Sequence, residues 1–235
     1  MKAVFHYGVV MALVAQLALI GCASSGGSGR QLQVGDEKSF DGLLEVTNSK
    51  ASKAWVRPGF DLSGYTRIKL EGAGIAFQPP NEQSRSSRAT GESYPMSQEA
   101  QARLARIMRE AFERELARST RFELTEEVGP EVLTVWGGLL DVVSFVPPQG
   151  VGRDNIYLRR VGEATLVIEL RDSESNATLM RIMDRRAVER MGGGSMKSNP
   201  VTNSGDVRRL ANTWARLFRQ RLDELTAQSR ATDSQ

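Results

Sequence analysis

Two residue types that perform much of enzyme chemistry are almost missing from this sequence. Its 235 residues include one histidine and one cysteine, His6 and Cys22, and both lie near the N-terminus. Everything that follows therefore lacks a histidine general base, a cysteine nucleophile, a disulfide and any His/Cys zinc site. The sequence predicts no catalytic residues, no metal site and no cofactor in its folded part.

An excess of either charge is also missing. The chain has 31 Lys+Arg against 28 Asp+Glu, a net charge of +3 that does not indicate a nucleic-acid-binding protein. The glycine-rich stretch 192–198 lies between a predicted strand and a predicted helix, as a phosphate-binding loop does. Met196 stands before Lys197, however, where that motif needs glycine. We expect neither a nucleic acid nor a nucleotide as partner.

The first 21 residues have the features of a secretory signal peptide. Lys2 is followed by an apolar run, Val9–Ile20, that is shorter than the roughly 20 apolar residues of a transmembrane helix. The run ends in Leu19-Ile20-Gly21-Cys22, which places cleavage between Gly21 and Cys22. An ordinary signal peptide or a short membrane anchor is the alternative.

This ending resembles the lipobox of bacterial lipoproteins. The resemblance implies diacylglycerol on the Cys22 thiol, an additional amide-linked acyl chain, and a stable membrane anchor. It also implies the outer membrane, with the domain facing the periplasm, because Ala23 follows the cysteine instead of the aspartate that retains lipoproteins in the inner membrane.

The mature chain divides into a tether, one domain and a tail. Residues 22–53 begin with a Gly/Ser stretch and are predicted to be the lipidated N-terminus and a flexible tether. Residues 54–228 are predicted to form a single domain, and 229–235 a polar tail. Long loops are expected at 78–95, 149–160 and 192–205.

Hydrophobic periodicity within 54–228 predicts an α+β fold. Helical spacing covers 98–118, with Ser97 as the N-cap, and a second segment that begins with Asp206 as its cap. The expected strands lie at 65–77, 121–128, 131–146, 161–172 and 177–190. We expect a mostly antiparallel sheet of about five strands with two amphipathic helices on one face.

Short motifs resemble an uncharacterised bacterial lipoprotein family, domain of unknown function 3313. They are WVRPG at 55–59, DLSGY at 61–65, Gly162-Glu163-Ala164, Asp172-Ser173 and Asp184-Arg185. The resemblance spans about residues 50–228. It supports the location and the fold, and it implies no activity and no catalytic residue.

Four carboxylates on predicted strands are candidates for a glycan or lipid hydrolase, which needs two acids at a suitable separation. Structural roles are the favoured interpretation for this set. Asp172 is expected to begin a hairpin turn, and Glu169 lies on the polar side of its strand. Asp184 shares its parity with apolar residues, which indicates an inward orientation with Arg186 or a helix arginine as its partner; a bulge that switches parity is the alternative. The fourth is Asp141.

Arginines and aromatic residues supply a candidate binding surface. The last helix carries several arginines that suit phosphate or carboxylate groups, although a mixed surface is the more ordinary interpretation. Aromatic side chains mark interfaces when they are exposed. The candidate binding residues are Trp55, Arg57, Tyr94, Tyr157, Arg185 and Arg186.

Three functions are compatible with this sequence. The favoured one is a non-catalytic binding or accessory module with an envelope protein as partner. A carrier of a small ligand or lipid is the second, and it requires an apolar pocket between sheet and helices. A carboxylate-based envelope hydrolase is the third, and it requires two acids that converge.

Overall fold

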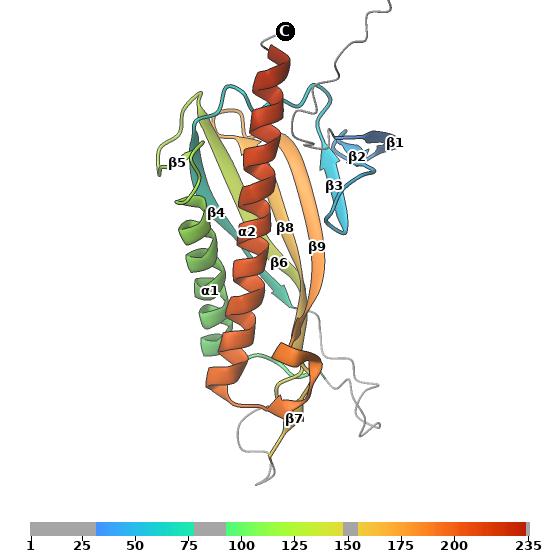
Figure 1. Cartoon of the computed structure of the whole chain (residues 1–235), viewed down its shortest axis with the longest axis vertical. Helices are drawn as coiled ribbons and strands as arrows, with labels where there is room; N and C mark the ends of the chain where they lie inside the picture. The colour runs from blue at the N-terminus through green and yellow to red at the C-terminus, as the bar shows by residue number, and fades with distance from the viewer. Residues whose placement is uncertain (1–31, 78–92, 148–154, 234–235) are drawn as a thin grey trace, which may run out of the picture.

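The computed structural model describes residues 32–77, 93–147 and 155–233. An eight-stranded sheet in the order β1-β2-β3-β9-β8-β6-β4-β5 is covered on one face by helices α1 (Gln98–Leu116) and α2 (Pro200–Asp233) (Figure 1). The predicted signal peptide with Gly21 and Cys22 lies outside the described residues, as do 78–92 and 148–154 of the expected loops. No helix of the described residues is long and apolar enough to cross a membrane.

The α+β class is confirmed, and the number of strands is larger than expected. The five expected strands are β4 (Arg67–Phe77), β5 (Glu123–Leu124), β6 (Val132–Ser144), β8 (Arg160–Asp172) and β9 (Thr178–Glu189). β4 is parallel to β5 and β6, and the other pairs are antiparallel. Three short strands extend the sheet beyond β9, and a separate two-stranded ribbon joins β7 (Tyr157–Leu158) to β10 (Met196–Lys197).

The flexible tether predicted for residues 22–53 is too long, because the folded domain begins before residue 54. The added strands are β1 (Val34–Lys38), β2 (Leu44–Val46) and β3 (Lys53–Val56). Leu43 and Val46 are 0% and 4% exposed, so this segment contributes to the buried interior. Strands this short give almost no periodic signal, and their partners lie far away in the sequence.

An ion-pair chain fastens this N-terminal segment to the helix-free face of the sheet. Arg181 on β9 contacts Asp41 from the β1–β2 connection and Glu169 on β8. Glu169 has the predicted polar parity but is only 6% exposed, which corrects its expected place on the polar surface. Burial alone would raise the pKa of Glu169, but hydrogen bonds donated by Arg181 and Arg171 outweigh burial and lower it.

The helices begin at the same end of the sheet and run parallel (Figure 1). Ser97 caps α1 as predicted, since its Oγ accepts a hydrogen bond from the Ala100 amide at 3.2 Å. The start predicted for α2 is wrong: Asn199 caps it, accepting from the Val201 and Thr202 amides at 3.0 and 2.9 Å. α2 also continues through most of the predicted tail, to Asp233.

The motif residues around Tyr65 lie at the end of the sheet where β4 begins. The Tyr65 hydroxyl donates to Asp172 at 3.0 Å, and burial together with Asp172 raises the pKa of Tyr65 to about 12. Asp172 begins the β8–β9 turn as predicted, because its Oδ1 accepts from the Ser175 amide at 2.8 Å. Two motifs separated by about a hundred residues thus meet and close this end of the domain.

Candidate functional site

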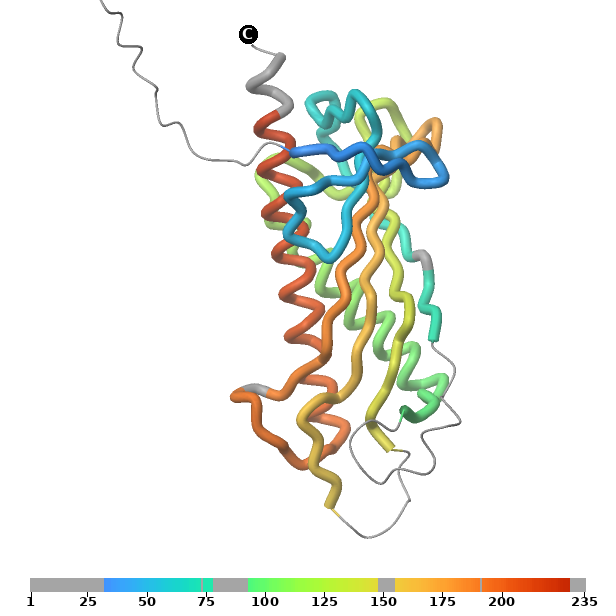
Figure 2. Tube along the Cα trace, turned by 90° about the vertical axis from the view of Figure 1, so that its right-hand side faces the viewer, coloured from blue at the N-terminus to red at the C-terminus, as the bar shows by residue number. Residues whose placement is uncertain are grey.

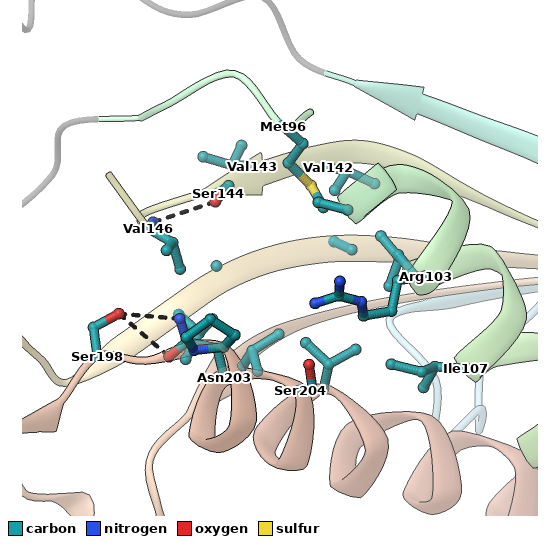
Figure 3. A pocket seen from close by; sticks show the side chains of 18 of the residues that line it. Met96, Arg103, Ile107, Val142, Val143, Ser144, Val146, Ser198, Asn203 and Ser204 are labelled. Carbon is teal, nitrogen blue, oxygen red and sulfur yellow. Dashed lines mark hydrogen bonds between the residues drawn. The ribbon is translucent and has the colours of Figure 1, made fainter. Parts of the chain in front are cut away.

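A cleft of about 920 Å³ opens between the sheet and the first turns of both helices. Its walls come from α1, α2, the end of β6 and the start of β8 (Figure 3). The volume lies in the range of small-molecule sites, roughly 300–1,000 Å³. Most of the lining is apolar and includes Met96, Leu104, Ile107, Met108, Leu139, Val142, Val146, Val161, Val188, Val207, Leu210 and Trp214.

The cleft occupies one end of the helix–sheet interface, and the other end is filled. Farther along the helices the rings of Phe112 and Phe218 pack in a tilted arrangement with their centroids 5.9 Å apart. Ser119 donates to Asp223 at 2.7 Å near the same end. Toward the helix starts, the Ser204 and Ile107 side chains line the cleft (Figure 3).

Polar groups gather at the side of the cleft where α2 begins. Lys197 and Ser198 line the rim, and the Ser198 hydroxyl is 3.0 Å from the Asn203 side-chain nitrogen. Arg103 reaches into the cleft from α1 and is paired with Glu99 one turn earlier (Figure 3). Glu99 of α1 and Ser144 of β6 line the cleft as well, so its apolar surface is bordered by polar groups on several sides, an arrangement that suits an amphiphilic ligand.

Gly162 on β8 is required where the sheet forms a wall of the cleft. A Cβ at this position would lie 2.4 Å from the carbonyl oxygen of Val143 on β6, a distance at which the strands must separate. Gly162 belongs to one of the motifs noted in the sequence. The motif therefore has a steric reason: it permits the close approach of β8 to the end of β6.

A buried ion pair holds the start of α2 in place beside the cleft. Arg190 at the end of β9 and Asp206 on α2 are 3% and 5% exposed, and they form an ion pair. Arg190 also donates to the Asn203 side chain at 2.7 Å and to the Leu158 carbonyl at 3.4 Å. Asp206 accepts two further bonds from Arg209. Asp206, expected to be a helix cap, is thus a buried anchor.

The four candidate carboxylates do not form a catalytic pair. Asp184 faces α2, as the inward alternative required, and accepts from Arg186 at 2.6 Å and from the Trp214 indole at 2.8 Å. Glu169 points to the opposite face and Asp172 lies in its turn, and both have lowered pKa values, the reverse of what a general acid needs. Asp141 lies beside Arg185 on the surface.

No group of three or more His, Cys, Asp or Glu that could hold a metal ion exists among the described residues. Two acids are among the lining residues of the cleft, Glu99 of α1 and Glu163 of β8, and each forms an ion pair with an arginine.

The family model for DUF3313, proteins of unknown function, matches residues 35–218. The chain belongs to this family. The match includes most of the cleft and begins inside β1. No curated protein matches the chain.

Several solved structures are similar to this DUF3313 protein. Protein XCC0632 from Xanthomonas campestris has a TM-score of 0.41 at 8% identity, and the match covers 75% of this chain and 93% of the XCC0632 chain. A putative neuraminyllactose-binding hemagglutinin homolog from Helicobacter pylori has a TM-score of 0.39 at 8% identity, with coverages of 74% and 92%. The PelC dodecamer from Paraburkholderia phytofirmans has a TM-score of 0.35 at 11% identity, with coverages of 69% and 96%.

The candidate binding residues are spread over the DUF3313 domain. Trp55 lies on β3, where Lys53 is 5.7 Å from its ring, and the Arg57 side chain donates to the Thr178 carbonyl at 2.6 Å. Arg185 pairs with Glu163 on the helix-free face of the sheet, whereas Arg186 pairs with Asp184 on the face that the helices cover. Only the two tyrosines lie at the cleft end: Tyr94 bridges to Ser144, and Tyr157 is exposed on β7. The six candidate binding residues therefore do not form one surface.

The polar residues of the cleft were missed in the sequence. Asn203 and Ser204 fell in the loop expected at 192–205, although they belong to the first turns of α2. Asn199 followed by Pro200 was the available signal, because asparagine is favoured as an N-cap and proline at the first helical position.

We predict that replacing Asp206 by alanine lowers the free energy of unfolding by about 3–5 kcal/mol, because Arg190 stays buried without its ion-pair partner. Urea unfolding followed by circular dichroism measures the change. Arg209→Ala is the control, and as a half-exposed partner it should cost less than about 1 kcal/mol.

The double variant Arg190→Met/Asp206→Leu should recover most of the stability that Asp206→Ala loses, because neither buried charge remains. A loss below about 1 kcal/mol for Asp206→Ala would contradict the anchoring role. So would a double variant no more stable than the single one.

Proposed function

We propose that this protein is a non-catalytic binding module of the bacterial cell envelope that holds the acyl chain of an amphiphile in its cleft. A lipid on Cys22 anchors it to the outer membrane, and the domain faces the periplasm. The cleft between the helices and the sheet is the observation that carries this proposal. A carrier of a small ligand or lipid requires an apolar pocket at this place.

The chemistry of the cleft favours an aliphatic chain over a polar ligand. The side chains that face the space are mostly methyl and methylene groups, with Leu104, Val146 and Val207 from three different elements. Each buried methylene contributes about 0.8 kcal/mol, so a stretch of eight contributes roughly 6 kcal/mol before the costs of association. Lys197 and Ser198 at the rim suit an anionic headgroup such as a carboxylate or phosphate.

The hydrolase alternative has no comparable support. Its carboxylates are engaged in separate ion pairs and turns, and two of them are ionised more readily than usual. Binding without turnover is the function that this geometry favours.

Filling the cleft should abolish ligand binding. The chain from Ala23 keeps every residue that the structure describes, and native mass spectrometry with palmitate should show one bound palmitate per chain. Ser204→Trp places an indole in the cleft and should weaken binding at least tenfold. Gln220→Trp puts the same side chain on the exposed surface of α2 and should leave binding unchanged.

Two results would contradict the cleft as the binding site. One is a palmitate adduct that is equally strong in Ser204→Trp and in the unchanged chain. The other is the absence of any adduct in the unchanged chain, with the fold verified by circular dichroism. The second result would return the interpretation to an accessory module that contacts an envelope protein.

The anchor is tested by radiolabelled palmitate and membrane fractionation of cells that produce the full chain. Cys22→Ala should lose the label and leave the outer-membrane fraction, because the acylated thiol is gone. Ala23→Asp is the matched control: it should keep the label and move to the inner membrane. Crosslinking before lysis should reveal one dominant envelope protein with the unchanged chain and lose it with Cys22→Ala. Label retained by Cys22→Ala would overturn the anchor.

A further inference from the structure

A small lobe projects from the cleft end of the domain. It consists of residues 155–160 and 190–201, in which β7 and β10 pair through Leu158 with Met196 and Tyr157 with Lys197. Figure 1 shows this β7–β10 lobe beyond the starts of both helices. Arg190 ties the lobe to α2, so its position relative to the cleft is set by the buried ion pair.

Three large apolar side chains of the lobe are exposed. Tyr157, Met196 and Val201 are 60%, 44% and 81% exposed. Tyr157 shares one face of the β7–β10 ribbon with its cross-strand partner Lys197, whereas Met196 and Leu158 share the other face. Val201 lies in the first turn of α2. Exposed apolar groups gathered at one projecting end indicate a contact surface.

The charge of the lobe has a single sign. Its residues include Arg159, Arg160, Arg190 and Lys197 and no aspartate or glutamate, and Asp154 and Glu189 directly precede its two segments in the sequence. The buried arginine is neutralised by Asp206, and Arg160 lies 4.0 Å from Glu163 and opposite Glu189 in the β8–β9 register.

Among the described residues, no ion pair reaches Arg159 or Lys197. The rest of the chain is close to balance, so this absence of acids is local. An exposed basic surface without acids is complementary to an anionic one.

We infer that the β7–β10 lobe docks onto the surface of an anionic lipid bilayer. Tyr157 and Val201 enter the interfacial region, where tyrosine and aliphatic groups are favoured. Arg159 and Lys197 meet the lipid phosphates. The combination of exposed apolar and basic groups fits a bilayer with anionic headgroups, because the interface of such a bilayer accepts both.

The lobe joins this surface to the cleft. Lys197 and Ser198 belong to the lobe and also line the rim, so a lipid whose headgroup contacts the lobe lies beside the cleft opening. The docking extends the proposed function but does not need an occupied cleft.

The docking is also separate from the proposed anchor. The chain enters the described domain beside the later turns of α2, whereas the lobe adjoins its first turn (Figure 2). The 34 residues of α2 span about 50 Å between these ends.

Vesicle co-sedimentation tests the inference with the unlipidated chain from Ala23. Binding should be strong to vesicles that contain phosphatidylglycerol, weak to pure phosphatidylcholine, and reduced by added salt. Arg159→Gln/Lys197→Gln should weaken partitioning roughly 30-fold. Lys50→Gln/Arg216→Gln removes the same two charges from exposed positions outside the lobe and should weaken it by less than about threefold.

An apolar variant and a cleft variant complete the test. Tyr157→Ser/Val201→Ser should weaken binding at least tenfold while leaving palmitate binding intact. Ser204→Trp should bind vesicles normally although its cleft is filled. Binding that does not depend on phosphatidylglycerol would overturn the inference, as would equal losses in the two charge variants. Loss of vesicle binding in Ser204→Trp would also overturn it, since attachment would then depend on the cleft.

Discussion

Arg190 and Asp206 bring opposite charges out of water at the point where the sheet, α2 and the β7–β10 lobe meet. Each charge would be costly to bury alone, and the cost is offset because the guanidinium and the carboxylate satisfy each other and their neighbours. The end of β9, the start of α2 and β7 consequently hold one relative position. The cleft wall formed by Asn203 and the rim formed by Lys197 both depend on that position.

The two ends of the domain have different physical characters. At one end Tyr65, Asp172 and Ser173 join the β8–β9 turn to neighbouring segments through hydrogen bonds, and the helices pack through Phe112 and Phe218. At the other end the helices and the sheet leave a cleft, and the adjoining lobe exposes apolar and basic groups. Most of the motifs that resemble the DUF3313 family build the closed end and the strands, with Gly162 the one that shapes the cleft. The motifs shared with the family therefore specify the fold more than they specify a ligand.

Patterns among near neighbours in the sequence predicted much of this structure. The parts that depend on contacts between distant residues could not be predicted. Ser97 and the apolar spacing after it identify α1, and alternation identifies β8 and its turn at Asp172, because these patterns depend on near neighbours in the chain. β1, β2 and β3 are too short to show alternation and are stabilised by distant partners such as Arg181. The cleft was not predictable as a site, because Leu104 has the same helical spacing as Leu116. Spacing shows which face is apolar, but only the packed structure shows whether that face is filled.

The account as a whole depends on an acyl chain occupying the cleft between α1, α2 and the sheet. The most direct measurement is a crystal structure of the chain from Ala23 with a fatty acid brominated near its methyl end, using the anomalous signal of bromine. We expect the bromine among Leu104, Ile107 and Leu210, with the carboxylate toward Lys197. Bromine bound elsewhere, or a cleft closed by movement of the helices onto the sheet, would contradict the account.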